Sequence, residues 1–522
     1  MHIIIKRVFD YKKPFIFCSF PNYNKSMSMN VLSSVESHKW KLILVLATVV
    51  VGTSGIFAVG EHNAIGQFGP LNKLSSPATT AEYHCTKPIT PPGNTSQAIG
   101  PCIDPGDTAF MYIAAIIVMI MTPGGVGFLY GGLTRRKNSL TVILQSFLVY
   151  AIVSIQWVVY GYSIMFGPDA GYGFIGNLDW VGMNNVLNNA PADVYAPSIP
   201  HLAYAMFQLM FAAITPALAI AGYADRLKMS AFLIHIVLWT TFVYDFAGHW
   251  NWSLGSQGTH PGWLAALGAE DFAGGTVIHI TSGFAGLVTA MFLGRRLGYG
   301  KAPFEPHSIP LIMLGTVLLW YGWFGFNPGS AGSAGFLETE AFQNTNIATA
   351  VSAMWWMFLS WAHTGKTSAV GAATGAVAAL VAITPASGFI GVYASIIMGF
   401  AAATVGFYCL ILKNRKRVDD ALDTWAVHGM CGVAGALITG LFSEKRINPA
   451  ANNGLFFGNP RQELVNATGA AAAVAWSFGI TFIIWKVMDW VWPGGVRVTP
   501  REEEIGLDLS QVGERAYSES VS

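Results

Sequence analysis

The feature that most constrains this chain is a series of apolar stretches, each long enough to cross a lipid bilayer as one helix. A helix rises about 1.5 Å per residue, so roughly 20 apolar residues cover the hydrocarbon layer. Eleven such stretches follow residue 105. Their approximate bounds are 108–131, 139–166, 201–222, 228–247, 273–293, 308–327, 341–361, 368–383, 389–412, 425–442 and 468–490. The sequence therefore predicts an all-α polytopic membrane protein with a transmembrane domain over residues 108–492.

The composition agrees with a membrane protein and excludes several other classes. Of the 522 residues, 53% are apolar and 11% are charged, whereas soluble domains carry roughly 25% charged residues. A net charge of +1 provides no basic face for a nucleic acid. No nucleophile–base pair, metal-ligand cluster or nucleotide loop stands out, so we expect neither an enzyme nor a cofactor. Cys85 and Cys102 share one polar stretch, where both a disulfide and a free pair are open.

Basic residues alternate between the loops, as expected when cytoplasmic loops are enriched in Lys and Arg. The odd-numbered loops are basic, and the even-numbered loops up to the eighth contain neither residue. The basic residues of the odd loops are Arg135, Arg136 and Lys137; Arg226 and Lys228; Arg295, Arg296 and Lys301; Lys366; and Lys413, Arg415, Lys416 and Arg417. The tenth loop departs from the pattern, with Lys445, Arg446 and Arg461. The alternation predicts a core that begins outside the cell and a cytoplasmic C-terminal tail, residues 493–522.

The N-terminal extension, residues 1–58, has the features of an export signal. Lys39 and Lys41 precede a short apolar run, residues 42–51, which is followed by small residues. A basic flank, a short apolar centre and a small-residue exit are typical of a cleaved signal peptide. A retained twelfth span is the alternative. Export of this kind would place residues 59–107 outside the cell.

Two copies of one motif lie on the fifth and tenth apolar stretches. The first reads His279-Ile-Thr-Ser-Gly-Phe-Ala-Gly and the second His428-Gly-Met-Cys-Gly-Val-Ala-Gly, so both are His-x-x-x-Gly-x-Ala-Gly. Copies that are five spans apart run in opposite directions, which indicates a five-plus-five inverted repeat followed by an eleventh helix. Inverted repeats bind the transported species near the middle of the membrane. The small residues would let the two helices approach closely.

Both histidines, and the aspartates that precede them, allow a structural and a functional interpretation. A single buried His is usually structural, but two in matching frames inside a membrane favour a functional site. His279 follows Asp271 by eight residues, about 12 Å along a helix, and His428 follows Asp423 by five residues, about 8 Å. Both imidazoles would therefore reach the middle of the bilayer. We interpret Asp423 as a helix N-cap, and Asp271 as a cap that also provides a favourable field for a cation.

Four longer motifs resemble those of the Amt/Mep/Rh ammonium transporters. They are Pro123-Gly-Gly-Val-Gly-Phe-Leu-Tyr-Gly-Gly132, Asp271-Phe-Ala-Gly-Gly-Thr-Val-Ile-His279, Gly322-Trp-Phe-Gly-Phe-Asn-Pro-Gly-Ser330 and Asp423-Thr-Trp-Ala-Val-His428-Gly-Met-Cys-Gly432. The motifs match in order and spacing over about residues 107–517. The resemblance implies an ammonium transporter or channel of the plasma membrane, assembled as a homotrimer with one pore in each subunit.

The resemblance also implies roles for particular aromatic residues. Trp252 falls at the indole of the family's outer ammonium site, and Phe211 and Ser330 fall at its other walls. Phe326 falls beside Phe211 as the second ring of a phenyl gate. Aromatic faces attract cations, and a hydroxyl accepts a hydrogen bond that ammonium can donate and potassium cannot. Without the motif, a tryptophan at a span end is more often part of the interfacial aromatic belt.

His279 and His428 match the pore histidines of the family. An intact cation loses far more solvation energy in an apolar pore than neutral ammonia does. Two imidazoles in contact could accept the proton, relay it and hydrogen-bond the neutral molecule, because imidazole donates and accepts near neutral pH. The hypothesis is that ammonium loses its proton near the gate and passes as ammonia.

The C-terminal tail resembles the segment through which prokaryotic members of the family bind PII-type regulators. The resemblance rests on residues 513–517, Gly-Glu-Arg-Ala-Tyr, after Gly506-Leu-Asp508.

There are two rival interpretations, a related gas channel and, from another class, an ammonium sensor. A Rh-like gas channel typically lacks the recruitment residues, whereas Trp252 and Ser330 are present here. An ammonium sensor usually carries an appended signalling domain, for which the stretch after the last span is too short.

Overall fold

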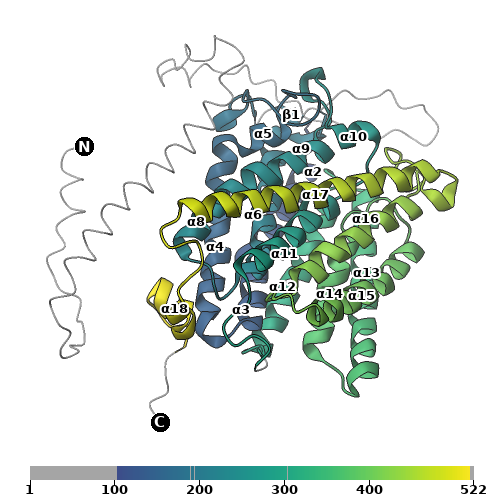
Figure 1. The fold of residues 1–522 in the computed structure, drawn as a ribbon. Helices are drawn as coiled ribbons and strands as arrows, with labels where there is room; N and C mark the ends of the chain where they lie inside the picture. The colour runs from purple at the N-terminus through teal and green to yellow at the C-terminus, as the bar shows by residue number, and fades with distance from the viewer. Residues whose placement is uncertain (1–102, 188–189, 193, 302–303, 518–522) are drawn as a thin grey trace, which may run out of the picture. The chain divides into compact units, whose positions relative to one another are not determined.

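The computed structural model describes residues 103–187, 190–192, 194–301 and 304–517, and this part of the chain is mostly helical (Figure 1). Nine helical segments within it are long and apolar enough to cross a membrane: Pro105–Leu133, Arg136–Phe166, His201–Tyr223, Met229–Trp252, Gly275–Leu293, Ile309–Gly329, Val392–Arg415, Trp425–Phe442 and Pro460–Val491. The shorter apolar helix α14 (Ala369–Ile383) and the helix α13 (Phe336–Thr364) take the predicted places of the eighth and seventh spans. The all-α polytopic fold is confirmed.

Several segments combine α-helices with π-helical turns. The α-helices are α2 (Pro105–Met119), α3 (Gly127–Leu133), α4 (Ser139–Gln156), α5 (Tyr162–Phe166), α6 (His201–Leu218), α7 (Ile220–Tyr223), α8 (Met229–Trp239), α9 (Asp245–Trp252), α10 (Trp263–Leu267), α11 (Thr281–Leu293), α12 (Ile309–Gly329), α15 (Val392–Arg415), α16 (Cys431–Phe442), α17 (Pro460–Val491) and α18 (Pro500–Ile505). The π-helical turns are η3 (Met121–Val126), η5 (Trp157–Gly161), η7 (Thr240–Tyr244), η9 (Gly275–Ile280), η10 (Trp425–Met430) and η12 (Asp508–Val512). Because π-helical turns are rare and often mark functional sites, their positions are informative.

The remaining elements are short and lie in the connections. They are the 3₁₀ turns η4 (Arg136–Asn138), η6 (Val181–Met183), η8 (Ser256–Gly258) and η11 (Leu455–Phe457), and the strands β1 (Pro191–Ala192) and β2 (Ala196–Pro200). The two strands pair antiparallel, with Pro191 opposite Pro200. They stand immediately before α6, so the chain enters the third segment from a fixed hairpin.

Several helix ends differ from the predicted bounds, those of α9, α13 and α17 by five residues or more. The fourth segment was predicted to end at residue 247, but α9 continues to Trp252, which is its last residue. The eleventh was predicted to begin at residue 468, but α17 begins at Pro460. Apolar composition does not mark these ends, because backbone hydrogen bonding continues a helix through polar residues such as Asn251 and Glu463. The extension of α9 places Trp252 in a half-buried position against Phe211.

Glycines bring the two motif copies into backbone contact. A Cβ atom added to Gly283 on α11 would lie 2.1 Å from the nitrogen of Gly429 in η10. A Cβ atom on Gly222 would lie 2.3 Å from the carbonyl oxygen of Gly286. Neither distance is open to a real side chain, so the close approach predicted from the small residues is present.

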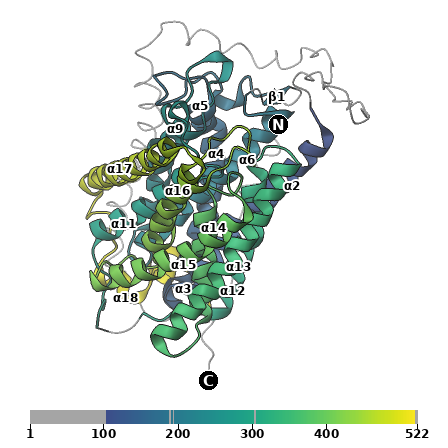
Figure 2. The same cartoon turned by 90° about the vertical axis from the view of Figure 1, so that its right-hand side faces the viewer.

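Helix α17 covers the two motif helices on one side, and both views show it beside α11 and α16 (Figures 1 and 2). Polar side chains fix it there: the Trp485 indole donates to Thr289 Oγ1 at 2.7 Å, and the Ser477 hydroxyl donates to the Thr281 carbonyl at 2.5 Å. These bonds join α17 to α11 away from water. Each one satisfies polar groups that could find no hydrogen-bond partner in lipid.

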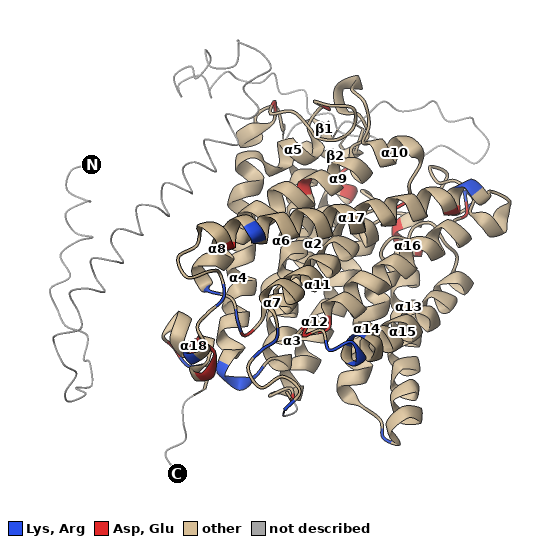
Figure 3. Ribbon diagram, in the orientation of Figure 1, with Lys and Arg blue, Asp and Glu red and all other residues tan. Residues whose placement is uncertain are grey.

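Charged residues lie mainly at helix ends and in the loops (Figure 3). One buried cluster joins several of the loops that are predicted to be cytoplasmic. Asp225 accepts from Arg135 at 2.8 Å and lies 3.3 Å from Arg296, and Asp419 pairs with Arg226 at 3.0 Å and Arg296 at 2.7 Å. Burial acts to raise the pKa of Asp225, but Arg135 and Arg296 outweigh it and hold that pKa below its ordinary value. The loops are therefore tied into one charged layer.

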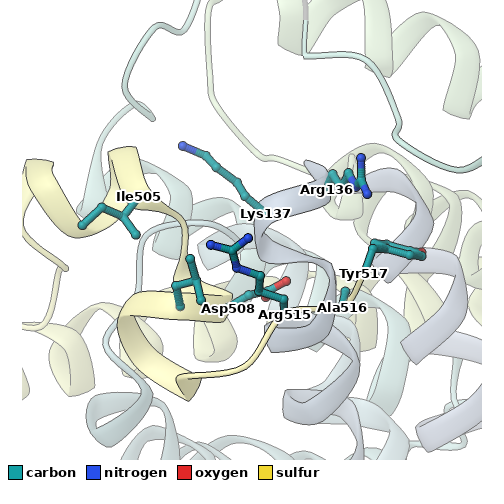
Figure 4. Close-up of a pocket in the computed structure, with 8 residues that line it drawn as sticks. Arg136, Lys137, Ile505, Asp508, Arg515, Ala516 and Tyr517 are labelled. Carbon is teal, nitrogen blue, oxygen red and sulfur yellow. The ribbon is translucent and has the colours of Figure 1, made fainter. Parts of the chain in front are cut away.

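The C-terminal tail returns to this layer. Asp508 in η12 accepts hydrogen bonds from the backbone N–H groups of Leu140 at 3.2 Å and Thr141 at 2.7 Å, so it caps α4 from the far end of the chain. Beside Asp508, a cavity of about 290 Å³ is lined by basic and apolar residues from the first loop and the tail (Figure 4). The Arg136 guanidinium lies 5.2 Å from the centre of the Tyr517 ring.

The predictions for the N-terminal part of the chain fall outside the described residues. These are the signal peptide in residues 1–58, nearly all of the segment 59–107, and the state of Cys85 and Cys102. The cysteines in the described part of the chain, Cys409 and Cys431, are free.

Candidate functional site

His279 and His428 meet where the two motif copies touch. Each lies in a π-helical turn, His279 in η9 and His428 in η10, and both side chains are buried. Their Nδ1 atoms are 3.3 Å apart and their ring centroids 5.4 Å apart. Among the described residues, Nε2 of His279 has no hydrogen-bond partner. The fold thus brings two distant imidazoles into contact and leaves one buried nitrogen open to a further partner.

The chain approaching His279 is held by Asp271. Its carboxylate accepts hydrogen bonds from the backbone N–H groups of Gly274, Thr276 and Val277 at 3.0, 2.9 and 3.0 Å, the geometry by which a side chain satisfies free N–H groups at the start of a helical segment. Gly274 adopts a φ of 117°, which side-chain-bearing residues rarely adopt. Burial raises the pKa of Asp271 to about 6, and the backbone hydrogen bonds offset part of that effect. The hydrogen bonds to Asp271 and the backbone conformation of Gly274 therefore both fix the start of η9.

A line of aromatic rings leads from Trp252 to the histidine pair. The centroid of Trp252 is 6.1 Å from that of Phe211, with the planes nearly perpendicular at 89°. The centroid of Phe211 is 4.2 Å from that of Phe326, which in turn is 6.2 Å from His279. Phe211 and Phe326 are buried, at 1% and 0% exposure. The residues predicted for a recruitment site, a gate and a pore thus form one continuous series of contacts.

Trp252 and Ser330 are held in place by backbone acceptors. The Trp252 indole N–H donates to the Asp271 carbonyl at 2.8 Å, so its polar edge is occupied and its ring faces stay available. The Ser330 hydroxyl donates to the Phe326 carbonyl at 2.9 Å. Its proton is therefore engaged, and the lone pairs of its oxygen remain to accept from another donor.

Two cavities lie at the ends of this line of rings. The first, which we call the vestibule, has a volume of about 420 Å³ and is lined by Trp252, Phe211 and Ser330 among others. The second has a volume of about 210 Å³ and is lined by His428 together with Tyr130 and other residues. Phe326 and His279 line neither cavity and separate the two. A species passing between the cavities along this line would have to cross the buried rings.

The prediction that Asp423 caps the tenth span is wrong. Asp423 has a positive φ of 62°, and its carboxylate forms an ion pair with Lys413 from α15. The capping acceptor is Asp420, whose carboxylate accepts from the backbone N–H of Trp425 at 2.8 Å. The chain turns sharply between the two aspartates, which directs the Asp423 side chain away from the free N–H groups of η10.

Three further residues of this region were missed by the sequence predictions. Trp323 stacks on His279 at a centroid distance of 5.5 Å, and its N–H donates to Thr384 Oγ1 at 2.8 Å. Phe207 contacts Phe211 at 4.8 Å, and Glu270 lines the vestibule. Trp323 stands inside one of the long motifs, and Glu270 directly precedes another. The proximity of Trp323 and Glu270 to these motifs is the sequence signal that could have identified them.

The fold and this arrangement define a class of protein: a multi-pass helical membrane protein whose buried rings and paired histidines separate two cavities. The family model of the Ammonium Transporter Family matches residues 109–517. The chain belongs to this family. It is 42% identical over 417 residues to an ammonium transporter of Bacillus subtilis, a match that covers 80% of this chain and 99% of that protein.

Other relatives agree with this assignment. The ammonium transporter Amt1 of Archaeoglobus fulgidus is 41% identical over 413 residues, covering 79% of this chain and 99% of that protein. Among solved structures, Mep2 of Saccharomyces cerevisiae superposes with a TM-score of 0.74 at 35% identity, over 80% of this chain and 93% of that one. The similarity thus extends over the transmembrane domain and most of the tail.

Proposed function

We propose that this protein transports ammonium, binding the cation in the vestibule and conducting ammonia, with or without the proton, past the histidine pair. The observation that carries the proposal is the series of contacts from Trp252 through Phe211, Phe326 and His279 to His428. The ring series connects a polar cavity that can receive a cation to a second cavity on the far side of the buried rings.

Recruitment rests on Trp252, Phe211 and Ser330. A cation near an aromatic face gains about 0.5–2 kcal/mol, more where water is excluded. The Ser330 oxygen has free lone pairs, because its proton is already donated to a carbonyl. An N–H of ammonium can therefore donate to Ser330 while the charge lies against the aromatic rings, an arrangement that potassium cannot use in full.

The phenyl rings then favour loss of the proton. Phe211 and Phe326 are buried and only 4.2 Å apart, so a hydrated cation does not fit between them. Stripping water from the cation costs far more than stripping it from neutral ammonia. Ammonia can cross this apolar passage if the proton follows another route.

The histidine pair offers that route. The two Nδ1 atoms are 3.3 Å apart, so a proton carried by one of them can form a hydrogen bond to the other. The tautomer of each imidazole decides whether its Nδ1 donates or accepts. The open Nε2 of His279 can bond the incoming molecule. A proton accepted on one ring could leave from the other toward the second cavity.

Assembly, orientation and regulation are part of the same proposal. We expect a homotrimer with one pathway in each subunit, in the plasma membrane, with the vestibule outside and the C-terminal tail cytoplasmic. The tail's contact between Asp508 and α4 would let a PII-type regulator acting on the tail influence the loops.

Uptake of radiolabelled methylammonium into proteoliposomes tests the proposal. We expect concentration-dependent, saturable uptake that protein-free vesicles lack and that unlabelled ammonium inhibits. Uptake that never saturates would favour a gas channel, and an absence of uptake would contradict transport. The presence of Trp252 and Ser330 in one cavity is the observation that favours a transporter over a gas channel.

A further inference from the structure

Glu270 is a second carboxylate in the wall of the vestibule, beside Asp271. Its backbone is fixed by one side chain of α17: the Glu270 N–H donates to Asn466 Oδ1 at 3.1 Å, and Asn466 Nδ2 donates to the Glu270 carbonyl at 3.3 Å. The next carbonyl, that of Asp271, accepts from the Trp252 indole. Glu270 is therefore one residue away from the group that positions the aromatic ring.

The Glu270 carboxylate lacks a counter-charge. Its Oε1 atom accepts from the backbone N–H of Asn452 at 2.6 Å, while Oε2 has no partner among the described residues. The residue is 7% exposed, and within the described part of the chain no Lys or Arg forms an ion pair with it. The polar side chains around it, such as Gln462 and Asn466, are neutral. A buried carboxylate in this state requires either a proton or a cation.

The other carboxylate of the vestibule, that of Asp271, is already occupied by hydrogen bonds from the backbone. Asp271 accepts three backbone N–H bonds and completes the start of η9. Glu270 is thus the carboxylate of this cavity that retains an acceptor oxygen. The vestibule is lined by Glu270, Trp252 and Ser330 together, so one cation can enter the neighbourhood of all three.

We propose that Glu270 is a cation-binding residue of the vestibule, whose free carboxylate oxygen accepts an N–H of ammonium on its way to the Trp252 ring. The inference rests on the proposed function and adds a charged group to a site otherwise built from aromatic rings and a hydroxyl. Ammonium would supply the missing counter-charge, and Glu270 would raise the concentration of the cation beside the gate.

The titration of Glu270 gives this role a measurable signature. Burial raises the pKa of Glu270 to about 7. The nearby Ser443 hydroxyl, which donates to the Asn452 carbonyl at 2.9 Å, and the Asn452 N–H offset part of the rise. The other charged groups on the adjoining segments are Asp271, Lys445, Arg461, Glu463 and the ion pair of Glu444 with Arg446. Glu270 takes a proton below neutral pH and then no longer attracts a cation. The apparent affinity for the cation should therefore fall as the external pH drops through 7.

The test is methylammonium uptake by Glu270→Gln in proteoliposomes at external pH 6 and pH 8. Methylamine is a stronger base than ammonia, so methylammonium stays protonated over this range and its own titration does not interfere. The Gln side chain can still accept from the Asn452 N–H, which preserves the local fold, and gel filtration in detergent checks assembly. Glu338→Gln is the matched control, because Glu338 stands at the start of α13, next to the vestibule residue Leu337, without lining the cavity.

At pH 8 we expect Glu270→Gln to raise KM about five-fold with kcat unchanged, the effect of one charge a few ångströms from the cation in a polar cavity. At pH 6 the variant and the wild type should have similar KM values. An unchanged KM at pH 8, or an equal rise in Glu338→Gln, would overturn the inference while leaving transport itself established. Absence of uptake by the wild-type protein would instead count against the proposed function.

Discussion

The Nδ1 atoms of His279 and His428 face each other at 3.3 Å, with the ring planes inclined by 28°. A hydrogen bond between two Nδ1 atoms needs a proton on one of them only, so the two neutral rings must be different tautomers. The pair consequently has two neutral arrangements, which differ in which ring donates its Nδ1–H and which ring carries its proton on Nε2, so their exchange moves two protons.

Replacing both histidines with leucine should abolish ammonium-driven current. His279→Leu with His428→Leu keeps the apolar volume but removes every nitrogen that could accept or pass the proton. Current from proteoliposomes on a solid-supported membrane, recorded after an ammonium jump, should fall about 100-fold or more, in the range expected when a positioned proton-transfer group is lost. A double variant with wild-type current would contradict the proton relay.

Trp252→Leu should weaken recruitment more than turnover. The cation–π interaction is worth about 0.5–2 kcal/mol, which corresponds to a roughly 2- to 30-fold rise in the KM for methylammonium. Trp361→Leu, at the exposed end of α13, removes an indole from the molecular surface and should leave KM unchanged. Equal effects of the two substitutions would mean that Trp252 acts as a general surface anchor.

Gly283→Ala should disrupt the contact between the motif copies. The new Cβ atom would lie 2.1 Å from the Gly429 nitrogen, so α11 and η10 must separate, at a cost of about 1–3 kcal/mol or more. The control is Gly479→Ala on α17, where a Cβ atom meets nothing within 4 Å. Thermal unfolding in detergent should show a lower apparent Tm for Gly283→Ala only. Loss of stability in both variants would point to a general intolerance of larger residues.

Glu270→Gln should stabilise the protein at alkaline pH. The folded-state pKa of Glu270 is raised to about 7 from the ordinary 4.5, so between these values the folded protein retains a proton that the unfolded chain has lost. The stability of the wild type therefore falls as pH rises through this interval, by up to about 3 kcal/mol once pH exceeds 7. The neutral variant avoids this cost. Its apparent Tm should exceed that of the wild type at pH 8 and approach it at pH 5, and an equal difference at both pH values would contradict the assignment.

The architecture followed from the sequence because its signals are local. Apolar stretches of bilayer length predicted the helical segments, and the spacing of two matching motifs predicted that His279 and His428 would come together. Both signals arise from constraints that act within one helix: apolar length in lipid, and the positions of small residues on a helix face. The helix ends were less accurate, since the polar ends of α9 and α17 continue beyond the apolar region.

Tertiary structure alone decided how the polar groups are paired. Asp420, and not Asp423, caps the tenth span, because Lys413 from another helix pairs with Asp423 and the backbone turns between the two. The packing of segments that are remote in sequence also placed Trp323 against His279, and it left Glu270 in the wall of the vestibule without a counter-charge. Burial and hydrogen-bond partners depend on which distant segments pack together, whereas the length and composition of a membrane helix are written into a single stretch of chain.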